Sequence, residues 1–334
     1  MRIAVDAMGG DLAPAEIVAG VLAAAARWTD TEFILVGDQD AIRTQFGHQP
    51  QRVNIAVHHA PDVIGMEDDP ARAVRRKPNS SLVQACRLVA EGSAEAIFSA
   101  GNTGAAAAAA LFTIGRLDGV QRPAIAVVLP ARSESGKVIV CDAGANVDCK
   151  PEWLAQFATM GAMYAEGIEG ITNPRVGLLN IGEETCKGNA LSKAAHALLE
   201  NAGHNWVGNV EAKAVMRGIA DVITCDGFDG NLVLKVAEST AEYTMSMLKD
   251  AFGSSLMAKL GGLLARSSLR GLKRKVDYTE YGGAVLLGIK GLVIIGHGCS
   301  PANAVVAALG RARTGLQNGL VSRMADHFAA IQAA

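Results

Sequence analysis

The stretch that decides the fold is the N-terminal sequence Met1-Arg2-Ile3-Ala4-Val5-Asp6-Ala7-Met8-Gly9-Gly10-Asp11. Residues 2–6 are typical of a buried strand, and a glycine pair flanked by aspartates follows them directly. A helical stretch at residues 14–27 comes next, and this strand–loop–helix order is typical of an α/β protein. The segment lacks the basic region, apolar stretch and small-residue cleavage site of a signal peptide, which predicts a cytoplasmic location.

The same order recurs along the rest of the chain. Further strands are predicted at residues 33–37, 53–58, 96–99, 124–129, 137–141, 175–180, 206–209, 222–225 and 293–295. The helices predicted between them include residues 81–91, 103–114, 152–165, 189–201 and 302–313. Strands separated by helices run parallel and are joined by crossovers, with one hairpin expected between residues 124–129 and 137–140. The sequence therefore predicts one large α/β/α domain over residues 1–334, in one or two lobes, with three layers around a mostly parallel sheet.

The composition indicates a large core and counts against several classes of protein. Half of the 334 residues are hydrophobic, and a core of that size needs neither disulfides nor a structural metal. Lys+Arg total 31 and Asp+Glu total 33, so the net charge of −2 gives no global signal for nucleic acid. No run reaches the roughly 18–20 apolar residues of a membrane-spanning helix. The six cysteines form no Cys-x-x-Cys pair and are expected to be free thiols.

Glycine stands beside Asp, Asn, Ser or His at six predicted strand ends. These loops are residues 6–11, 99–104, 142–146, 180–184, 226–231 and 296–298. Ligands of open α/β sheets bind outside the carboxyl ends of the strands, so we expect the six loops to meet at one edge. Glycine lets backbone amides approach a ligand, and the helix start after each loop suits an anion such as phosphate. Together they predict a large polar site, although any single loop is also an ordinary turn or cap.

Several common motifs are absent from the sequence. It has no Gly-x-x-x-x-Gly-Lys-Ser/Thr and no Gly-x-Gly-x-x-Gly after the first strand. It also has no Gly-x-Ser-x-Gly elbow and no His-Glu-x-x-His. These absences count against a P-loop ATPase, an ordinary dinucleotide-binding Rossmann enzyme, a serine hydrolase and a zincin.

The strand-end loops together resemble those of one family. They are Ile3-Ala4-Val5-Asp6-Ala7-Met8-Gly9-Gly10-Asp11, Ser99-Ala100-Gly101-Asn102-Thr103-Gly104-Ala105, Cys141-Asp142-Ala143-Gly144-Ala145-Asn146, Leu178-Leu179-Asn180-Ile181-Gly182-Glu183-Glu184 with Lys187-Gly188-Asn189, Val207-Gly208-Asn209-Val210-Glu211, Cys225-Asp226-Gly227-Phe228-Asp229-Gly230-Asn231 and Tyr281-Gly282-Gly283-Ala284. In this order, over essentially the whole chain, they resemble the PlsX-type phosphate acyltransferases of bacterial phospholipid synthesis. Only Thr185-Cys186 departs from the pattern, and the spacing there is kept.

The resemblance implies a fold, a reaction and partners. The fold would be similar to that of the isocitrate and isopropylmalate dehydrogenases and of phosphotransacetylase. The reaction would convert acyl-[acyl carrier protein] and inorganic phosphate to acyl phosphate and free carrier protein, with no cofactor and no metal. The protein would be a homodimer at the inner face of the membrane, bound peripherally to its anionic surface. A membrane glycerol-3-phosphate acyltransferase would use the product.

The polar strand ends suit this chemistry. A phosphate oxygen is already anionic at pH 7, so the enzyme has to position it and to stabilise the oxyanion rather than supply a strong base. We assign the catalytic donors and the fixed cation to Lys187, Asn102, Asn231 and His297. We assign phosphate and substrate binding to Gly9, Gly10, Asp11, Ser99, Gly101, Thr103, Gly104, Asn146, Asn180, Glu184, Asp226 and Asp229. The alternative at each position is structural, with the carboxylates as caps, Lys187 as a solvated lysine and His297 as a hydrogen-bonded histidine.

A basic cluster precedes Pro78 and comprises Arg72, Arg75, Arg76 and Lys77. Such a run is usually a solvated face. The carrier protein is acidic, however, so the functional alternative is that it docks on this cluster in a salt-sensitive way.

Residues 251–276 carry six basic residues and no acidic one. Apolar residues recur there at helical spacing, and they are Phe252, Leu256, Leu260, Leu263 and Leu264. Together with cations such as Lys273 and Arg274 they predict an amphipathic helical hairpin whose apolar tip enters the lipid interface. The alternative is a helix packed on the body of the protein or on a partner.

Three other functions stay open from the residues. A short-chain phosphate acyltransferase acting on acyl-coenzyme A would share the chemistry. A metal- and NAD-dependent 3-hydroxyacid dehydrogenase of the same fold would need carboxylates converging on a divalent cation, to which Asp226 and Asp229 could contribute. A non-catalytic membrane scaffold would have no need of six polar loops.

Overall fold

The computed structural model describes residues 1–47, 52–276 and 282–333. Eleven strands in the described chain form a single sheet. They are β1 (Arg2–Asp6), β2 (Glu32–Gly37), β3 (Ile55–His59), β4 (Ala96–Ser99), β5 (Ala124–Pro130), β6 (Lys137–Cys141), β7 (Arg175–Asn180), β8 (Asn205–Glu211), β9 (Val222–Thr224), β10 (Ala284–Leu287) and β11 (Leu292–Ile295). Their order across the sheet is β3-β2-β1-β4-β11-β10-β5-β6-β9-β7-β8.

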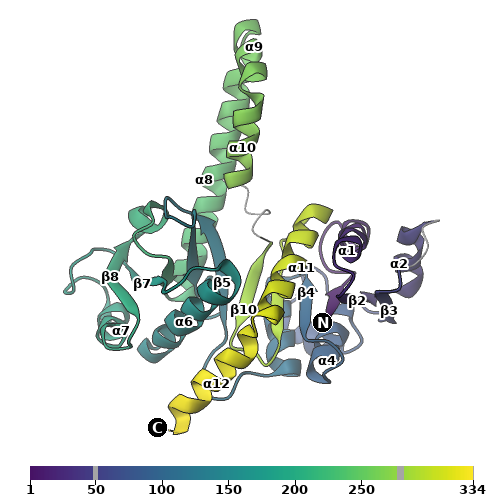
Figure 1. Cartoon of the computed structure of the whole chain (residues 1–334), viewed down its shortest axis with the longest axis horizontal. Helices are drawn as coiled ribbons and strands as arrows, with labels where there is room; N and C mark the ends of the chain where they lie inside the picture. Colours follow the sequence, from purple (N-terminus) through teal and green to yellow (C-terminus); the bar gives the residue numbers. More distant parts are fainter. Residues whose placement is uncertain (48–51, 277–281, 334) are drawn as a thin grey trace.

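Helices cover both faces of this sheet (Figure 1). The α-helices of the body are α1 (Ala15–Arg27), α2 (Gln39–Phe46), α3 (Pro70–Arg76), α4 (Ser81–Ala90), α5 (Thr103–Ala109), α6 (Pro151–Tyr164), α7 (Ala190–Glu200), α11 (Ala302–Gln317) and α12 (Leu320–Ala333). Two π-helical turns extend α5 and α6, and a 3-10 helix follows β8; they are η1 (Ala110–Ile114), η2 (Ala165–Glu169) and η3 (Ala212–Arg217). The predicted mostly parallel α/β/α architecture is confirmed.

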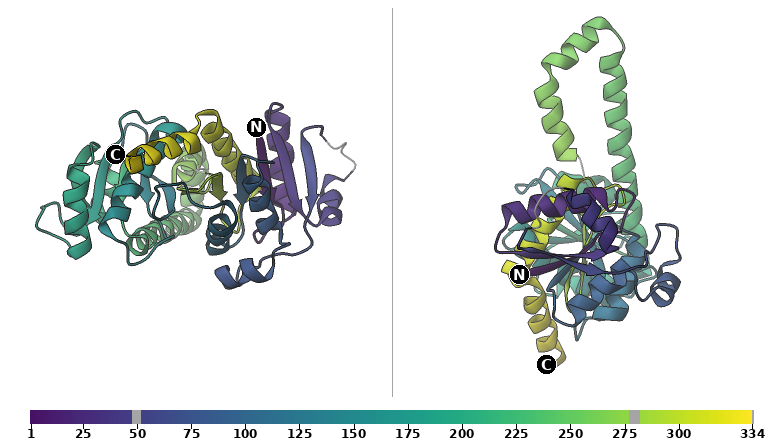
Figure 2. Two further views of the ribbon diagram at one scale, coloured as in Figure 1. Left: turned by 90° about the horizontal axis from the view of Figure 1, so that it is seen from below. Right: turned by 90° about the vertical axis from the view of Figure 1, so that its right-hand side faces the viewer.

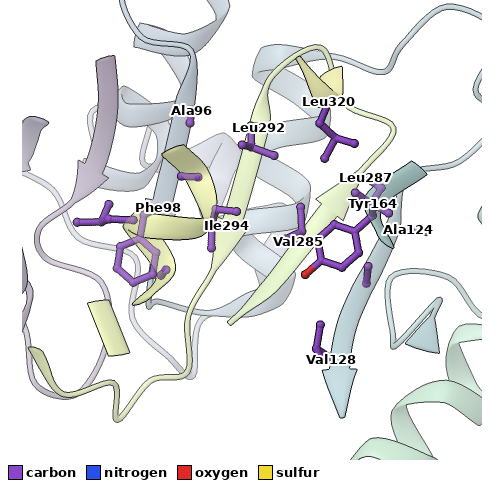
Figure 3. Packing of buried hydrophobic residues seen from close by; sticks show 14 of the residues in the cluster. Ala96, Phe98, Ala124, Val128, Tyr164, Val285, Leu287, Leu292, Ile294 and Leu320 are labelled. Carbon is purple, nitrogen blue, oxygen red and sulfur yellow. The ribbon is translucent and has the colours of Figure 1, made fainter. Parts of the chain in front are cut away.

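Two buried clusters of apolar side chains fill the spaces between the layers. One lies under α1, α6, α11 and α12, and the other lies under α4 and α5. Figure 3 shows the first cluster at the middle of the sheet, where the paired residues Val285 and Ile294 lie between Phe98 and Tyr164. Residues of β4, β5, β10 and β11, four neighbouring strands at the middle of the sheet, therefore share one core.

The sheet consists of two parallel halves that run in opposite directions. Strands β3, β2, β1, β4 and β11 are mutually parallel, and so are β6, β9, β7 and β8. Between the halves, β10 pairs antiparallel with β11 and β5, and β5 pairs antiparallel with β6. The predicted hairpin between residues 124–129 and 137–140 is the β5–β6 pair.

The reversal corrects the expectation that all six strand-end loops leave one edge of the sheet. The last residue of β11, Ile295, pairs with Ala284, while Cys141 at the end of β6 pairs with Ala126. Ala126 in turn pairs with Val285, the neighbour of Ala284. The carboxyl ends of β11 and β6, one from each half, thus differ in level by one residue along the strands, at the middle of the sheet. Their loops leave in opposite directions from almost the same level.

A long helical hairpin projects from the body. It consists of α8 (Gly227–Gly253), α9 (Leu256–Leu264) and α10 (Arg266–Val276). At 1.5 Å per residue the 27 residues of α8 span about 40 Å. Only the first part of α8 lies against the sheet, while its far end and α9 stand clear of the body in Figure 1 and in the right-hand view of Figure 2. None of the helices in residues 1–47, 52–276 and 282–333 combines the length and apolarity needed to cross a membrane.

Candidate functional site

A cavity of about 690 Å³ is lined by β5, α5 and the first part of α8. It lies where the loops of the two half-sheets meet. Its polar residues are Asp11, Thr103, Arg122, Asn146, Asn231, Lys235, Glu238 and His297. The other lining residues are glycines and apolar side chains, so one hollow joins a polar surface to an apolar one.

Glycines allow the loops after β1, β4 and β11 to pack together at one end of the cavity. A Cβ on Gly9 would lie 2.5 Å from Asp6 Oδ2 and 2.9 Å from the amide nitrogen of Gly101. Gly10 has a φ of 101°, and a Cβ there would lie 2.8 Å from the carbonyl oxygen of Gly298. Gly9 and Gly10 thus stand behind the cavity wall, whereas Gly101 and Gly298 form part of it.

Ser99 faces Asp6 rather than the cavity. Its hydroxyl donates to Asp6 Oδ2 at 2.7 Å and accepts from the amide of Gly101 at 3.1 Å. Both side chains are buried. Burial raises the pKa of Asp6, and hydrogen bonds from hydroxyls, including that of Ser99, oppose the rise. The pair joins the ends of β1 and β4 beneath the loops that line the cavity.

Three polar side chains line the cavity beside these loops, and they are Asp11, Thr103 and His297. The amide of Asp11 donates to the carbonyl of Gly298 at 2.8 Å, which fixes the loops after β1 and β11 to each other. His297 is exposed, and its Nδ1 lies 3.0 Å from Cys299 Sγ. Gly104, in the first turn of α5, also lines this end. Backbone amides, a hydroxyl and an imidazole therefore border the same space.

Asp142 organises the loop after β6. Its Oδ1 accepts hydrogen bonds from the amides of Ile125, Gly144 and Ala145 at 2.8, 3.2 and 3.0 Å. Its Oδ2 accepts from the backbone amide and the side-chain amide of Asn146 at 2.7 and 2.9 Å. Burial raises the pKa of Asp142 against the opposing effect of these hydrogen bonds. The Asn146 side chain lines the cavity, but both of its amide hydrogens are used for loop structure, because Nδ2 also donates to the carbonyl that precedes β5.

One face of α8 forms the wall beside this loop. Asn231, Leu234, Lys235 and Glu238 recur at the i, i+3, i+4, i+7 spacing of a single helix face, and all four line the cavity. Lys235 Nζ and Glu238 Oε2 form an ion pair at 2.8 Å. Asn231 makes no side-chain hydrogen bond within the described part of the chain, so its amide is available to a ligand.

Two cations line the cavity among the residues that the structure describes, Arg122 and Lys235. The Arg122 guanidinium lies 4.8 Å from the ring centroid of Trp153, which holds it by a cation–π contact. Lys150 Nζ lies 5.9 Å from the same centroid. The Trp153 ring thus lies near two positive charges, and of these Arg122 lines the cavity.

Asn102 lies next to the cavity but serves as a tether. Its Oδ1 accepts from the amide of Ala105 as the N-cap of α5. Its Nδ2 donates to the carbonyls of Met66 and Asp68 at 2.8 and 3.1 Å. With both amide hydrogens used in this way, Asn102 anchors the segment before α3 instead of offering a donor to a substrate.

The loop after β7 lies away from the cavity. Strand β7 is separated from β6 by β9, and Asn180, Glu184 and Lys187 are not among the lining residues of the described chain. Asn180 accepts from the amide of Ile181 at 2.8 Å, and the Lys187 side chain is exposed. The structure places Lys187 beside Asn180 and Glu184, but it does not bring this loop to the predicted site residues that line the cavity.

Asp226 and Asp229 are placed at the start of α8 and outside the cavity lining. Asp226 accepts from the amides of Phe228 and Cys149, each at 2.8 Å, and so caps the helix. Partial burial and the neighbouring Asp226 raise the pKa of Asp229.

The predicted carrier-docking cluster lies on α3, at the outer side of α5. Arg72, Arg75 and Arg76 are exposed. Lys77 instead forms a 2.6 Å ion pair with Asp68 and stabilises the preceding loop. Arg75 lies 5.3 Å from the centroid of the Phe112 ring, which is itself a cavity residue.

The predicted membrane segment forms the outer part of the hairpin. Its leucines are exposed: Leu256 by 85%, Leu260 by 55%, Leu263 by 62% and Leu264 by 79%. Phe252 is half-buried, and a Cβ on Gly262 would lie 3.1 Å from its ring. Lys273 and Arg274 lie in α10, beyond the part of that helix whose side chains the structure describes.

Sequence reasoning missed the side of the cavity formed by α8 and by the far end of α5. Arg122, Lys235 and Glu238 were not predicted, nor were the apolar residues Leu111 and Phe112. For Lys235 and Glu238 a signal was present, because residues 231, 234, 235 and 238 recur at the spacing of one helix face after the capping Asp226. For Arg122 the sequence carries no such signal, because its place depends on the pairing of β5.

Comparisons with known proteins agree with this architecture. Residues 1–323 match the family described as "Fatty acid synthesis protein". The chain is 50% identical over 332 residues to the phosphate acyltransferase of Pelotomaculum thermopropionicum, with 99% of this chain and 96% of that protein covered. It is 49% identical over 326 residues to the phosphate acyltransferase of Moorella thermoacetica, with 98% and 95% covered.

Solved structures share the fold at low sequence identity. A phosphotransacetylase from Streptococcus pyogenes superposes with a TM-score of 0.60 at 18% identity, over 95% of this chain and 94% of that one. A branched-chain phosphotransacylase from Enterococcus faecalis gives a TM-score of 0.55 at 14% identity, over 95% and 99%. The predicted likeness to the phosphotransacetylase fold is thereby confirmed.

Proposed function

The chain belongs to the fatty acid synthesis protein family of phosphate acyltransferases, and we propose that its substrates are an acyl-[acyl carrier protein] and inorganic phosphate. The observation that carries the proposal is the cavity, in which glycine-loop amides and two cations adjoin an apolar wall. Such a hollow suits an anion and an acyl chain at once. The acyl phosphate would enter glycerophospholipid synthesis through a membrane glycerol-3-phosphate acyltransferase.

Phosphate would attack the thioester directly. One oxygen of the hydrogen phosphate dianion adds to the carbonyl carbon, and the carbon–sulfur bond breaks as the tetrahedral intermediate collapses. The phosphate proton ends on the carrier thiol, so the products are acyl phosphate and free carrier protein. Because the nucleophile is already an anion, the residues need to position it and to stabilise negative charge.

The geometry supports a division of roles among the cavity residues. The loop containing Gly101, Thr103 and Gly104 would hold phosphate through amides and a hydroxyl. Asn231 would donate to the oxyanion, and His297 would donate to phosphate or return the proton to the leaving sulfur. We assign the role of the fixed cation to Arg122 and Lys235 instead of Lys187, because these two residues line the cavity.

Two surface features support the carrier protein and the membrane as partners. Arg72, Arg75 and Arg76 form an exposed cationic patch on α3, and Arg75 touches the cavity residue Phe112. An acidic carrier protein docked there would present its thioester near the cavity. The exposed leucines and cations at the tip of the hairpin suit peripheral attachment to an anionic membrane.

The homodimer implied by the family resemblance also has a candidate surface. An apolar stripe on α8 faces away from the cavity residues and is more than half exposed along its length: Phe228, Leu232, Val236, Tyr243 and Met247. We propose that a second copy covers it, which would bury the stripe from water. Light scattering should give a dimer for the wild type and a shift toward monomer for Tyr243→Glu with Met247→Glu; a wild-type monomer would contradict the proposal.

The reaction is tested with purified protein, palmitoyl-[acyl carrier protein] and phosphate, with palmitoyl-coenzyme A and acetyl-coenzyme A in parallel series. Mass spectrometry should detect palmitoyl phosphate that depends on both phosphate and the carrier-bound substrate. If the protein prefers short-chain acyl-coenzyme A, the acyl donor is acyl-coenzyme A and not the acyl-[acyl carrier protein]. Absence of acyl phosphate from every donor would overturn the proposal.

A further inference from the structure

One wall of the cavity is apolar along its whole length. It consists of Ala107, Ala108, Leu111 and Phe112, which we call the α5 wall. With Gly104 these residues recur at the i, i+3, i+4, i+7, i+8 spacing of a single helix face. They begin beside the polar loops after β4 and continue along α5 into η1. At 1.5 Å per residue the face from Gly104 to Phe112 covers roughly 12 Å.

Further apolar residues line the same hollow. Ile125 and Val127 of β5 and Leu234 of α8 line the same cavity and belong to the same apolar cluster as Ala107 and Leu111. Their side chains carry no hydrogen-bonding group. The amides of a pantetheine arm would lose their water here without compensation, whereas a hydrocarbon chain would gain from burial.

Side-chain size rises along the α5 wall, away from the polar loops. The first positions are glycine and alanine, and the last two are Leu111 and Phe112. The Phe112 ring is 52% exposed and is held by Arg75, whose guanidinium lies 5.3 Å from the ring centroid. The small side chains of the α5 wall therefore leave space near the polar loops. At the far end of the wall the Phe112 ring, held by Arg75 of α3, narrows this space.

We propose that the α5 wall receives the acyl chain and that Phe112, positioned by Arg75, limits the length of chain that is bound. The inference rests on the proposed acyl transfer and names the substrate subsite within that cavity. The carbonyl lies at the polar loops, and the chain extends along α5 toward Phe112. Phe112 is thus a specificity-determining residue, and Arg75 is a positioning residue.

Binding of saturated alkylphosphonates of 8, 10, 12 and 14 carbons tests the subsite without turnover. These compounds resemble the product in charge and chain, and calorimetry gives their affinities in the absence of carrier protein. Each buried methylene should strengthen binding by about fourfold until the chain reaches Phe112, where the gain should stop. An affinity independent of chain length in the wild type would overturn the inference.

Variants locate the limit. Phe112→Ala should move the length at which the gain stops to a longer chain, and Arg75→Ala should move it in the same direction by less. Ala108→Leu should move it to a shorter chain, with Ala107→Val as a second variant should the first fail to fold. Leu198→Ala, at a 41% exposed position on α7, is the matched control and should leave the length dependence unchanged.

The outcomes separate this inference from the reaction itself. If the chain length at which affinity stops rising is the same as in the wild type for Phe112→Ala, Ala108→Leu and Ala107→Val, the acyl chain binds elsewhere. This conclusion would hold even where the wild type forms acyl phosphate. Shifted length dependence in a protein that makes no acyl phosphate would support the subsite and contradict the reaction. A uniform loss of affinity at all lengths in folded variants would also contradict a length limit at Phe112.

Discussion

The hydroxyl of Ser99 donates a 2.7 Å hydrogen bond to the buried carboxylate of Asp6, and this bond joins the ends of β4 and β1. The loops that follow both strands border the cavity, so the pair sets the separation of two parts of the candidate site. A buried carboxylate is costly to ionise, and the hydrogen bond only partly offsets that cost.

Asp6 should make stability depend on pH. Its pKa in the folded protein is raised above that of the unfolded chain, about 3.9, because it is buried. The folded state then binds the proton more tightly than the unfolded chain does. Asp6 therefore lowers the free energy of unfolding as the pH rises from the pKa of the unfolded chain to the higher pKa of the folded protein. Asp6→Asn should lack that loss, and its free energy of unfolding relative to the wild type should rise as the pH increases above about 4. Parallel stability curves from urea titrations of the two proteins would contradict the assignment.

The two cations of the cavity should matter more than the cation of the loop after β7. Arg122→Ala should lower kcat/KM for phosphate by about 10²–10³-fold, as expected for loss of a preorganised charge at the reacting groups. Lys187→Ala should change it by less than about threefold, because the lysine is exposed and outside the cavity lining. Thermal unfolding checks that both variants fold. Equal and large losses would return Lys187 to the mechanism.

The hairpin should bind anionic vesicles through its exposed leucines. Leu260→Glu with Leu263→Glu removes two apolar side chains from the tip and adds two negative charges, so binding to phosphatidylglycerol vesicles should fall at least tenfold. Sedimentation with vesicles measures it. Leu198→Glu, on α7, introduces a charge at a distant exposed leucine and should bind as the wild type does. Retained binding by the tip variant would point to another anchor.

The α3 patch should govern the use of carrier-bound substrate. Arg72→Glu with Arg76→Glu should raise KM for acyl-[acyl carrier protein] about tenfold at low salt, and the effect should shrink as salt screens the charges. The reaction with acyl-coenzyme A should not show this dependence. Arg217→Glu, on η3, is the control at an exposed arginine of another face. Unchanged KM in the α3 variant would place the docking surface elsewhere.

Local patterns in the sequence were sufficient to predict most strands and helices. Strand composition, loop glycines and helical spacing gave β1, β4, β6 and α5 within a few residues, because each of these elements carries its own signal. Strand β10 was missed. Its four apolar residues are too few for periodicity to separate strand from helix.

Apart from the β5–β6 hairpin, the pairing across the sheet could not be predicted, and this pairing decides which loops form the site. The sequence placed Lys187 in the site because every strand end was assumed to share one edge. The antiparallel pairing of β10 and β5 instead brings together the ends of β11 and β6, and it leaves β7 two strands from β6. The loops containing Gly101, Asn146 and His297 meet at the cavity for this reason. The same pairing places Arg122 there, which no local pattern indicated.

The most direct test of direct phosphate attack follows the oxygen atoms. The protein is given palmitoyl-[acyl carrier protein] and phosphate labelled with ¹⁸O at all four positions, and the acyl phosphate is analysed by mass spectrometry within one turnover. Attack by a phosphate oxygen at the cavity should give palmitoyl phosphate that retains all four labels, with no carrier thiol released before phosphate is added. Release of carrier thiol without phosphate, together with a palmitoyl group attached to the protein, would contradict direct attack.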